Sequence, residues 1–193
     1  MTSPIWQPTP ARASATNMAA FMAFVGERHG ISVPDYAALY AFSIETPEQF
    51  WIAAWDFCEV IAETRGDTVV RNLDRMPGAE WFPDAHLNFA ENLLRRRDEA
   101  DALVHWCEDR IRRRLSFADL YDSVSRVAQA LAAEGVGPGD KVAGLLPNAP
   151  EAIIAMLAAT SLGAIWCACG PEFGVQAVLD RFKQVEPKVL FVT

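Results

Sequence analysis

The chain has 193 residues, of which 51% are apolar and 22% charged, and its formal net charge is −8. The apolar fraction suffices for a substantial core, and the charged fraction is near the globular average, which argues against wholesale disorder. The acidic balance argues against a general nucleic-acid or anionic-membrane binder, because either needs a net attraction to polyanions.

Targeting and cysteine patterns point to one compartment. The start, Met1 to Pro8, lacks the basic and apolar stretches of a secretory signal, and the longest apolar run, Ala152 to Ala159, is far short of the ~18 residues of a membrane span. Cysteines stand at Cys58, Cys107, Cys167 and Cys169. The Cys-x-Cys spacing of the last two differs from the Cys-x-x-Cys of zinc and redox sites. We therefore expect a cytoplasmic protein with reduced thiols, no metal site and no membrane partner.

The first half of the chain, residues 1–98, has the pattern of helices and irregular loops. Apolar residues at i, i+3, i+4 and i+7 predict an amphipathic helix from Thr16 to His29, which Gly30 ends. Asp35 is placed to cap a short helix through Phe42.

Thr46 as N-cap and Pro47 at the first helical position predict a further helix, continuing to about Thr64. One face of it carries several large apolar residues, namely Trp51, Ala54, Trp55, Cys58 and Ile61. So many aromatic rings favour a packing surface against another domain over a cofactor site. Residues 66–86 are rich in turn signals and read as an extended segment, followed by a helix from Leu87 to Leu94 with Asn88 near its start.

From Ala102 the pattern becomes α/β. Leu103–Trp106 is a predicted strand, Glu108-Asp109 a turn, and Arg112–Leu115 a hairpin partner. Ser116 and Asp119 form a predicted capping box that opens a long helix.

The remaining chain alternates strands and helices with short connections. Predicted strands cover Lys141–Leu146, Ala164–Ala168 and Lys188–Thr193, and predicted helices run from Asn148 or Pro150 to Gly163 and from Val175 to Val185. Such a β-α-β-α-β run implies parallel strands and right-handed crossovers. Because no helix, cap or tail follows the last strand, we expect an incomplete sheet and a chain that is part of a longer protein.

Two glycine-containing segments are candidates for ligand binding. Gly135-x-Gly137-x-Gly139 lies between a helix and a strand, the wrong order for a dinucleotide or phosphate loop, so a turn is expected. Cys167–Gly174 follows a parallel strand and precedes a helix, where ligands of open α/β sheets bind. Its glycines would let a ligand approach the backbone, although a plain connecting loop fits the pattern equally well.

The other polar and charged residues that could take part in binding or catalysis are better explained by structural roles. Asn148 is expected to cap its helix, although its loop lies at the same sheet edge. The arginine runs at residues 95–97 and 110–114 are typical of solvated faces. The histidines at positions 29, 86 and 105 are scattered, so no triad, His-Glu-x-x-His motif or carboxylate pair is defined, and we expect no catalytic residue in this chain.

Four segments follow one another in an order that resembles the opening of the adenylate-forming acyl-CoA synthetase superfamily: residues 115–121, 135–143, 146–152 and 158–165. The front half, with Ile5–Pro10, Phe50-Trp51, Trp55–Phe57 and especially Trp81–Leu93, resembles the amino-terminal cap of its acetyl- and acetoacetyl-CoA synthetase branch. Residues 171–182 and 186–190 are closer to the acetoacetyl type. The resemblance covers essentially the whole chain.

The resemblance implies a two-step ligase that uses ATP, coenzyme A and Mg²⁺. Acetoacetate would attack ATP to give an acyl-adenylate and pyrophosphate, and the thiol of coenzyme A would then displace AMP, a reaction of lipid and ketone-body metabolism. The superfamily's phosphate loop and catalytic lysine are expected beyond residue 193. By resemblance, Gly170, Pro171, Glu172 and Phe173 lie near coenzyme A. The loop departs from the family by having Cys167-Ala-Cys169-Gly in place of small hydroxyl residues, so backbone contacts are expected there rather than side-chain ones.

The resulting hypothesis is an α/β fold with a helical cap at residues 1–98 and the start of the AMP-binding large domain at residues 99–193. The 193-residue chain by itself is expected to be inactive. Two alternatives stay open: a part of an acetyl- or propionyl-CoA synthetase, and a short non-catalytic protein that docks on a full-length ligase. Acyl selectivity and oligomeric state do not follow from the sequence.

Overall fold

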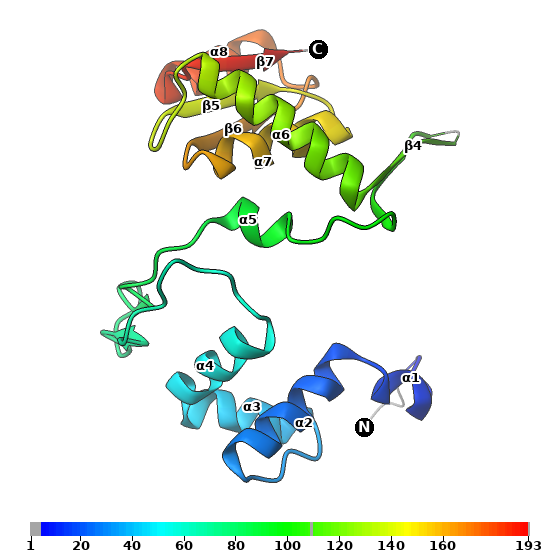
Figure 1. Ribbon diagram of the computed structural model, residues 1–193, viewed down its shortest axis with the longest axis vertical. Coiled ribbons are helices and arrows are strands. Elements are labelled where there is room, and N and C mark those ends of the chain that lie inside the picture. The colour runs from blue at the N-terminus through cyan, green and yellow to red at the C-terminus, as the bar shows by residue number, and fades with distance from the viewer. Residues whose placement is uncertain (1–4, 109, 193) are drawn as a thin grey trace. The chain divides into compact units, whose positions relative to one another are not determined.

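The computed structural model describes residues 5–108 and 110–192, which form two compact units divided between Leu87 and Asn88 (Figure 1). The first unit is helical and the second is α/β with a small open sheet, so the expected fold class is confirmed. The domain boundary expected after residue 98 stays a prediction. Within the described ranges, no helix is both long and apolar enough to cross a bilayer.

The first unit contains four helices and a short two-stranded ladder among its described residues: α1 (Pro10–Ser14), α2 (Asn17–His29), α3 (Tyr36–Glu45), α4 (Pro47–Phe57), β1 (Val70–Arg71) and β2 (Glu80–Trp81). Two predicted helix ends are confirmed, because Asp35 accepts a backbone N–H bond at the start of α3 and Gly30 ends α2 with φ of 64°. Thr16, predicted as the first residue of its helix, is the N-cap of α2, and its hydroxyl accepts from the N–H of Ala19. Helix α1 was not predicted from the sequence, although Thr9 and Pro10 repeat the Thr-Pro start signal of α4.

Helix α4 is shorter than predicted. It ends at Phe57 rather than near Thr64, because Glu59 takes a left-handed conformation with φ of 51°. The chain then turns back, and Thr64 pairs with His86. Thr46 is the N-cap residue, but its hydroxyl donates to the carbonyl of Phe42 at 2.9 Å and so serves the end of α3. A proline at the first helical position therefore starts α4 without a side-chain cap.

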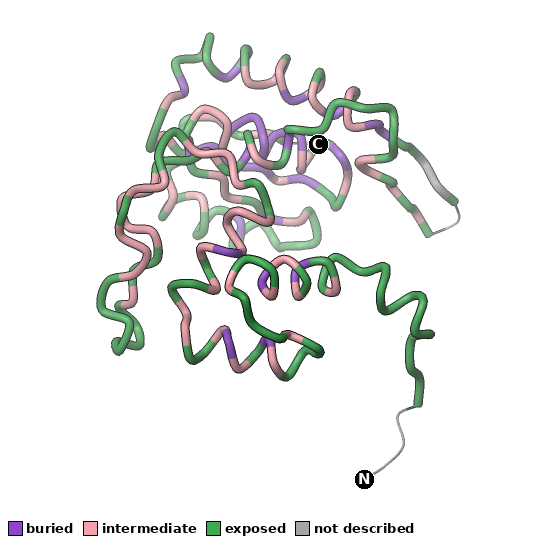
Figure 2. Tube along the Cα trace, turned by 60° about the horizontal axis from the view of Figure 1, so that its bottom comes forward, coloured by how far each residue is buried: buried purple, intermediate pink, exposed green. Residues whose placement is uncertain are grey.

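The core of the first unit is made by aromatic and aliphatic side chains from α2, α3 and α4. Its buried members are Phe21, Val25, Leu39, Phe42 and Ala53. The ring of Phe21 lies 5.7 Å from that of Phe50 and 5.1 Å from that of Phe57, at tilted or edge-on angles. Residues 66–86 contain no fully buried residue, as Figure 2 shows, which fits the predicted extended surface segment.

The second unit begins with one short helix and a hairpin and continues as alternating helices and strands: α5 (Phe89–Leu93), β3 (Asp101–Trp106), β4 (Ile111–Ser116), α6 (Phe117–Ala133), β5 (Lys141–Leu145), α7 (Pro150–Ser161), β6 (Ile165–Cys169), α8 (Val175–Val185) and β7 (Val189–Val192). These bounds agree with the predicted elements to within a few residues. The predicted turn at Glu108-Asp109 includes Asp109, which lies outside the described residues.

The hairpin runs directly into the longest helix of the second unit. Strands β3 and β4 pair antiparallel, with Leu103 opposite Leu115. Ser116 is both the last residue of β4 and the N-cap of α6. Its hydroxyl accepts from the N–H of Asp119, and the Asp119 carboxylate accepts from the N–H of Ser116, which completes the predicted capping box.

The sheet of the second unit has the strand order β6-β5-β7, with both pairs parallel as predicted. From β5 the chain passes through α7 to β6 on one side, and from β6 it returns through α8 to β7 on the other. Because parallel crossovers are right-handed, these two connections place α7 and α8 on opposite faces of the sheet. In the described residues, β6 and β7 are the edge strands.

The core of the second unit lies between the sheet, α6 and α7, and it includes Val124, Leu131, Val142 and Leu157. Against this core packs the half-buried Trp166, whose indole lies across Gly144 of the neighbouring strand. A Cβ atom at position 144 would stand 2.7 Å from the Trp166 ring. Glycine is therefore needed at position 144 to make room for the ring, and not for its backbone angles.

Asn88 connects the ends of two helices. Its Oδ1 accepts from the N–H of Glu91 and so caps the start of α5 at 3.1 Å. Its Nδ2 donates to the carbonyls of Thr160 and Ser161, each at 3.1 Å, at the end of α7. One side chain thus satisfies a free donor at the start of one helix and donates to two carbonyls in the last turn of another.

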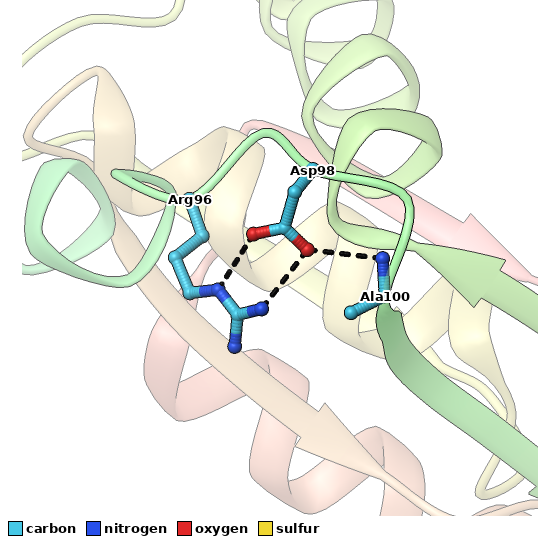
Figure 3. A network of polar contacts seen from close by, with 3 residues as sticks. All are labelled: Arg96, Asp98 and Ala100. Atoms are coloured by element: carbon cyan, nitrogen blue, oxygen red, sulfur yellow. Dashed lines mark hydrogen bonds and ion pairs between the residues drawn. The ribbon is translucent and has the colours of Figure 1, made fainter.

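The first arginine run lies against α6 and does not simply face solvent. Arg96 donates to both carboxylate oxygens of Asp98 at 2.9 Å, and Asp98 also accepts from the N–H of Ala100 (Figure 3). These bonds lower the pKa of Asp98, with the Arg96 bond acting most strongly. The guanidinium of Arg96 stacks on the Phe117 ring at 4.0 Å. The segment between α5 and β3 is thereby held against the first turn of α6.

The glycine-rich segment after α6 forms the predicted helix-to-strand turn, and an ion pair closes it. Asp140 accepts from Lys188 Nζ and from the N–H of Gly137, both at 2.9 Å, and Lys188 also donates to the carbonyl of Gly135 at 2.5 Å. The Lys188 bond, and then the Gly137 bond, lower the pKa of Asp140.

A pH-dependent contribution to stability is expected from Asp140. A carboxyl whose folded pKa is depressed stabilises the fold above its unfolded pKa, ~3.9, and this contribution is lost as the pH falls through the lower folded value. The Asp140→Asn variant should therefore lose less stability than the parent between pH 5 and pH 3, as measured by urea midpoints.

The control for this experiment is Asp180→Asn, which removes an exposed carboxylate that accepts from the Gln176 amide. This control should keep the parent's acid sensitivity. If the Asp140→Asn variant and the parent lose equal stability on acidification, the ion pair has no such role.

Candidate functional site

The carboxyl ends of the three parallel strands meet at one edge of the sheet. Leu145 is paired with both Cys169 and Val192, so β5, β6 and β7 end at the same level. The N–H of Leu146 donates to the carbonyl of Cys169 at 3.1 Å, which joins the exits of β5 and β6. The two loops that leave these strands, residues 146–149 and 170–174, are therefore neighbours.

These two loops diverge at a topological switch point. Strands β5 and β6 are adjacent, and the helices that follow them lie on opposite faces of the sheet. In open α/β sheets, ligands bind in the crevice that this divergence creates outside the carboxyl ends of the strands. The fold thus identifies the same loop that the sequence pattern selected, residues 170–174, and adds the loop at residues 146–149.

The loop at residues 170–174 is a tight, exposed turn. The N–H of Phe173 donates to the carbonyl of Gly170 at 3.3 Å, and the carboxylate of Glu172 folds back over the Cα of Gly170, so that a side chain at position 170 would overlap it. Pro171, Glu172 and Phe173 are all exposed. The predicted loop begins too early, because Cys167 and the buried Cys169 belong to β6.

Gly174 is the N-cap of α8, and no side chain caps that helix. The first backbone N–H groups of α8 therefore carry partial positive charge next to the loop. No Cβ contact would form at Gly174 within 4 Å, so the backbone there is open to approach. These features suit backbone contacts with a polar ligand.

The loop at residues 146–149 corrects one prediction. Asn148 does not cap α7, because Ala149 occupies the N-cap position and α7 starts at Pro150 without a side-chain cap. The proline supplies the start signal, since its missing N–H needs no partner there. Asn148 instead lines a hollow of about 250 Å³, whose other wall is residues 103–106 of β3. His105 also lines this hollow, and its distance from Asn148 in the sequence gave no sign that the two lie close together.

The titratable groups with perturbed pKa values serve structural contacts. Burial acts to raise the pKa of Glu151, but its own backbone N–H and the Arg113 guanidinium, 2.7 Å away, leave it lowered. Bonds from Ser116 lower the pKa of Asp119 in the capping box. Within the described residues, no group of three or more metal-ligating side chains comes together. The shifts at Glu151 and Asp119 therefore arise from contacts that hold the fold together.

A second surface of interest is an apolar groove of about 470 Å³ in the first unit. It is lined by Trp51, Ala54, Trp55, Cys58, Val60, Trp81, Phe82 and Leu87. Ring pairs form its walls, with Trp51 and Trp81 5.6 Å apart and Trp55 and Phe82 4.8 Å apart. The aromatic face predicted for α4 is therefore present. Its lining offers no charged group to orient a reacting ligand.

Arg181 is a residue near the candidate loop that the sequence analysis missed. Its guanidinium lies 4.6 Å from the centre of the Phe173 ring. Phe173 and Arg181 are eight residues apart, and a loop residue and two helical turns lie between them. Because Phe173 lies outside the helix, periodicity in the sequence gave no reason to pair the two residues. The available hint was a basic residue near the middle of an exposed helix that follows a candidate loop.

Comparisons with known proteins bear on both units. The family model described as AMP-binding enzyme matches residues 89–193, and the one described as acetyl-coenzyme A synthetase N-terminus matches residues 36–93. The two matches overlap over the residues of α5.

Three proteins illustrate the similarity. An acetoacetyl-coenzyme A synthetase from Rhizobium meliloti (strain 1021) is 47% identical over 98% of this chain and 29% of its own length. The malonamoyl-CoA synthetase vrtB of Penicillium aethiopicum is 40% identical over 92% of this chain and 25% of its own. The solved acetoacetyl-CoA synthetase from Streptomyces lividans is 41% identical, with a TM-score of 0.90 over 99% of this chain and 30% of its own. The chain therefore spans less than a third of each of these proteins.

Proposed function

The chain belongs to the AMP-binding enzyme family, and we propose that it is the amino-terminal part of an ATP-dependent acetoacetate–CoA ligase. The observation that carries this proposal is the 47% identity to an acetoacetyl-coenzyme A synthetase over 98% of the chain. The similarity of the fold to that of the Streptomyces lividans enzyme, with a TM-score of 0.90, also supports the proposal. In this proposal residues 1–98 are the helical cap, residues 99–193 begin the AMP-binding domain, and the enzyme is cytoplasmic.

The proposed reaction has two steps. A carboxylate oxygen of acetoacetate attacks the α-phosphorus of ATP, and the bond to the bridging oxygen breaks, releasing pyrophosphate. The resulting mixed anhydride has AMP as a good leaving group. The thiol of coenzyme A, after losing its proton, then attacks the acyl carbon, and AMP departs with the pair of electrons from the acyl–oxygen bond.

We propose that this chain's contribution is the loop of Gly170, Pro171, Glu172 and Phe173, which would lie beside coenzyme A. The exposed turn and the uncapped start of α8 support contacts through the backbone. Mg²⁺ would offset the repulsion between ATP and the anionic acid. In this proposal, ATP and the rest of the longer protein hold the Mg²⁺ ion, since the described residues bring no group of three or more metal-ligating side chains together.

The function is tested by acid-dependent exchange between ATP and labelled pyrophosphate, which reports the first step alone. The longer protein that contains this chain should support exchange with acetoacetate, and the 193-residue chain should stay at background. Exchange by the short chain with acetoacetate would contradict its proposed inactivity. No exchange with any acid by the longer protein would contradict the ligase itself.

The same assay separates the substrate alternatives. Malonamate is the second candidate, because a malonamoyl-CoA synthetase is 40% identical and both acids carry a carbonyl group at carbon 3. Acetate and propionate lack that carbonyl and test the acetyl- or propionyl-CoA synthetase alternative. A stop codon directly after the Thr193 codon would instead favour the short non-catalytic protein.

A further inference from the structure

The loop at the switch point has an aromatic ring whose position depends on one cation. Phe173 is the last residue before the Gly174 cap, and its side chain is 38% exposed. The guanidinium of Arg181, from the middle of α8, lies 4.6 Å from the ring centre. This distance is within the range in which a cation is attracted to the face of an aromatic ring.

The backbone on either side of Phe173 offers little restraint. Glycines at positions 170 and 174 flank the turn, and the hydrogen bond from Phe173 to Gly170 is long at 3.3 Å. Helix α8 itself is lightly anchored, since Val178 is its one buried residue among those described. A fixed orientation of the ring therefore needs a side-chain contact, and Arg181 supplies one.

We propose that Arg181 is a positioning residue that holds the Phe173 ring against the first turns of α8, so that the loop stays open toward the switch-point crevice. Held there, the ring would present an apolar face to a ligand that binds beside residues 170–174. This inference rests on the proposed function for its ligand, which is the pantetheine arm of coenzyme A. A freely turning ring would have to be ordered when coenzyme A binds, and that ordering weakens binding.

The expected consequence is a selective change in the use of coenzyme A. In the longer enzyme, Arg181→Met should raise the KM for coenzyme A by about twofold to fivefold, the size expected for an exposed cation–π contact. Acetoacetate-dependent pyrophosphate exchange and kcat should stay unchanged. Arg181→Lys keeps a cation near the ring and should restore most of the KM.

Matched variants distinguish positioning from charge or stability. Lys183→Met removes a neighbouring exposed cation of the same helix and should leave the KM for coenzyme A unchanged. After Phe173→Leu, adding Arg181→Met should raise the KM no further, because the ring through which Arg181 acts is gone. Equal effects of Arg181→Met with and without Phe173, or an unchanged KM in Arg181→Met itself, would overturn the inference.

The contact has a readout that is independent of activity. In the 193-residue chain, the Cδ protons of Arg181 should show an upfield ring-current shift in NMR spectra that disappears in Phe173→Leu. A shift that is absent from the parent chain refutes the contact. If the shift is present but the longer protein shows no exchange with any acid, the proposed function fails while the Arg181–Phe173 contact stands.

Discussion

Replacing Asn88 with alanine should lower the free energy of unfolding of the second unit by about 2–4 kcal/mol. Loss of an N-cap costs about 1 kcal/mol, and each of the two bonds to the end of α7 is worth about 0.5–1.5 kcal/mol. All three bonds come from one part-buried side chain, to Glu91, Thr160 and Ser161. The substitution therefore frays the start of α5 and the end of α7 together.

A serine at position 88 separates the contribution of the N-cap from that of the two bonds to α7. Serine keeps an oxygen that can accept from the N–H of Glu91, but its short side chain has no amide to donate to the α7 carbonyls. Asn88→Ser should thus recover about 1 kcal/mol relative to Asn88→Ala. Urea denaturation followed by far-ultraviolet circular dichroism measures both variants. Equal stability of Asn88→Ala and the parent would show that α5 and α7 are not joined through this residue.

Gly144→Ala is expected to destabilise the sheet by about 1–3 kcal/mol, the usual cost of overpacking a filled core. The new methyl group would stand 2.7 Å from the Trp166 ring and 3.0 Å from a methyl group of Leu146. Gly144 lies on the central strand β5, and the ring packs against the core. To relieve the overlap, the indole must leave its place or β5 and β6 must separate.

Gly137→Ala is the matched control. Nothing lies within 4 Å of a Cβ at position 137, and its φ is outside the left-handed range. It should leave stability unchanged or raise it by up to about 1 kcal/mol, through a less flexible unfolded chain. Combining Gly144→Ala with Trp166→Leu should cost less than the sum of the two single changes, because the smaller side chain leaves room for the methyl group. Strict additivity would exclude the overlap as the cause.

Local signals in the sequence predicted most of the second unit, because several helices there have their own start or stop residues. Ser116 with Asp119 opens α6, and the glycine at position 163 follows the end of α7. Parallel pairing and an open sheet followed from the alternation of short strands and helices. The candidate loop at residues 170–174 could be found for the same reason, since its place depends only on element order.

The errors arose where distant segments decide the local structure. Helix α4 was extended to Thr64, because the pairing of Thr64 with His86 is invisible to periodicity. The cap assigned to Asn148 was wrong, because Pro150 alone suffices to start α7. Neither the Arg181–Phe173 contact nor the joint role of Asn88 could be predicted, since both depend on how helices pack.

The junction at Ser116 has a consequence for how this part of the protein tolerates length changes. Because the last residue of β4 is also the N-cap of α6, no connecting loop lies between the strand and the helix. One extra residue in the first turn of α6 would rotate the rest of that helix by about 100° relative to the hairpin. The apolar stripe would then turn away from α7. During evolution, insertions and deletions should therefore accumulate in the hairpin tip and be rare at the junction of β4 and α6.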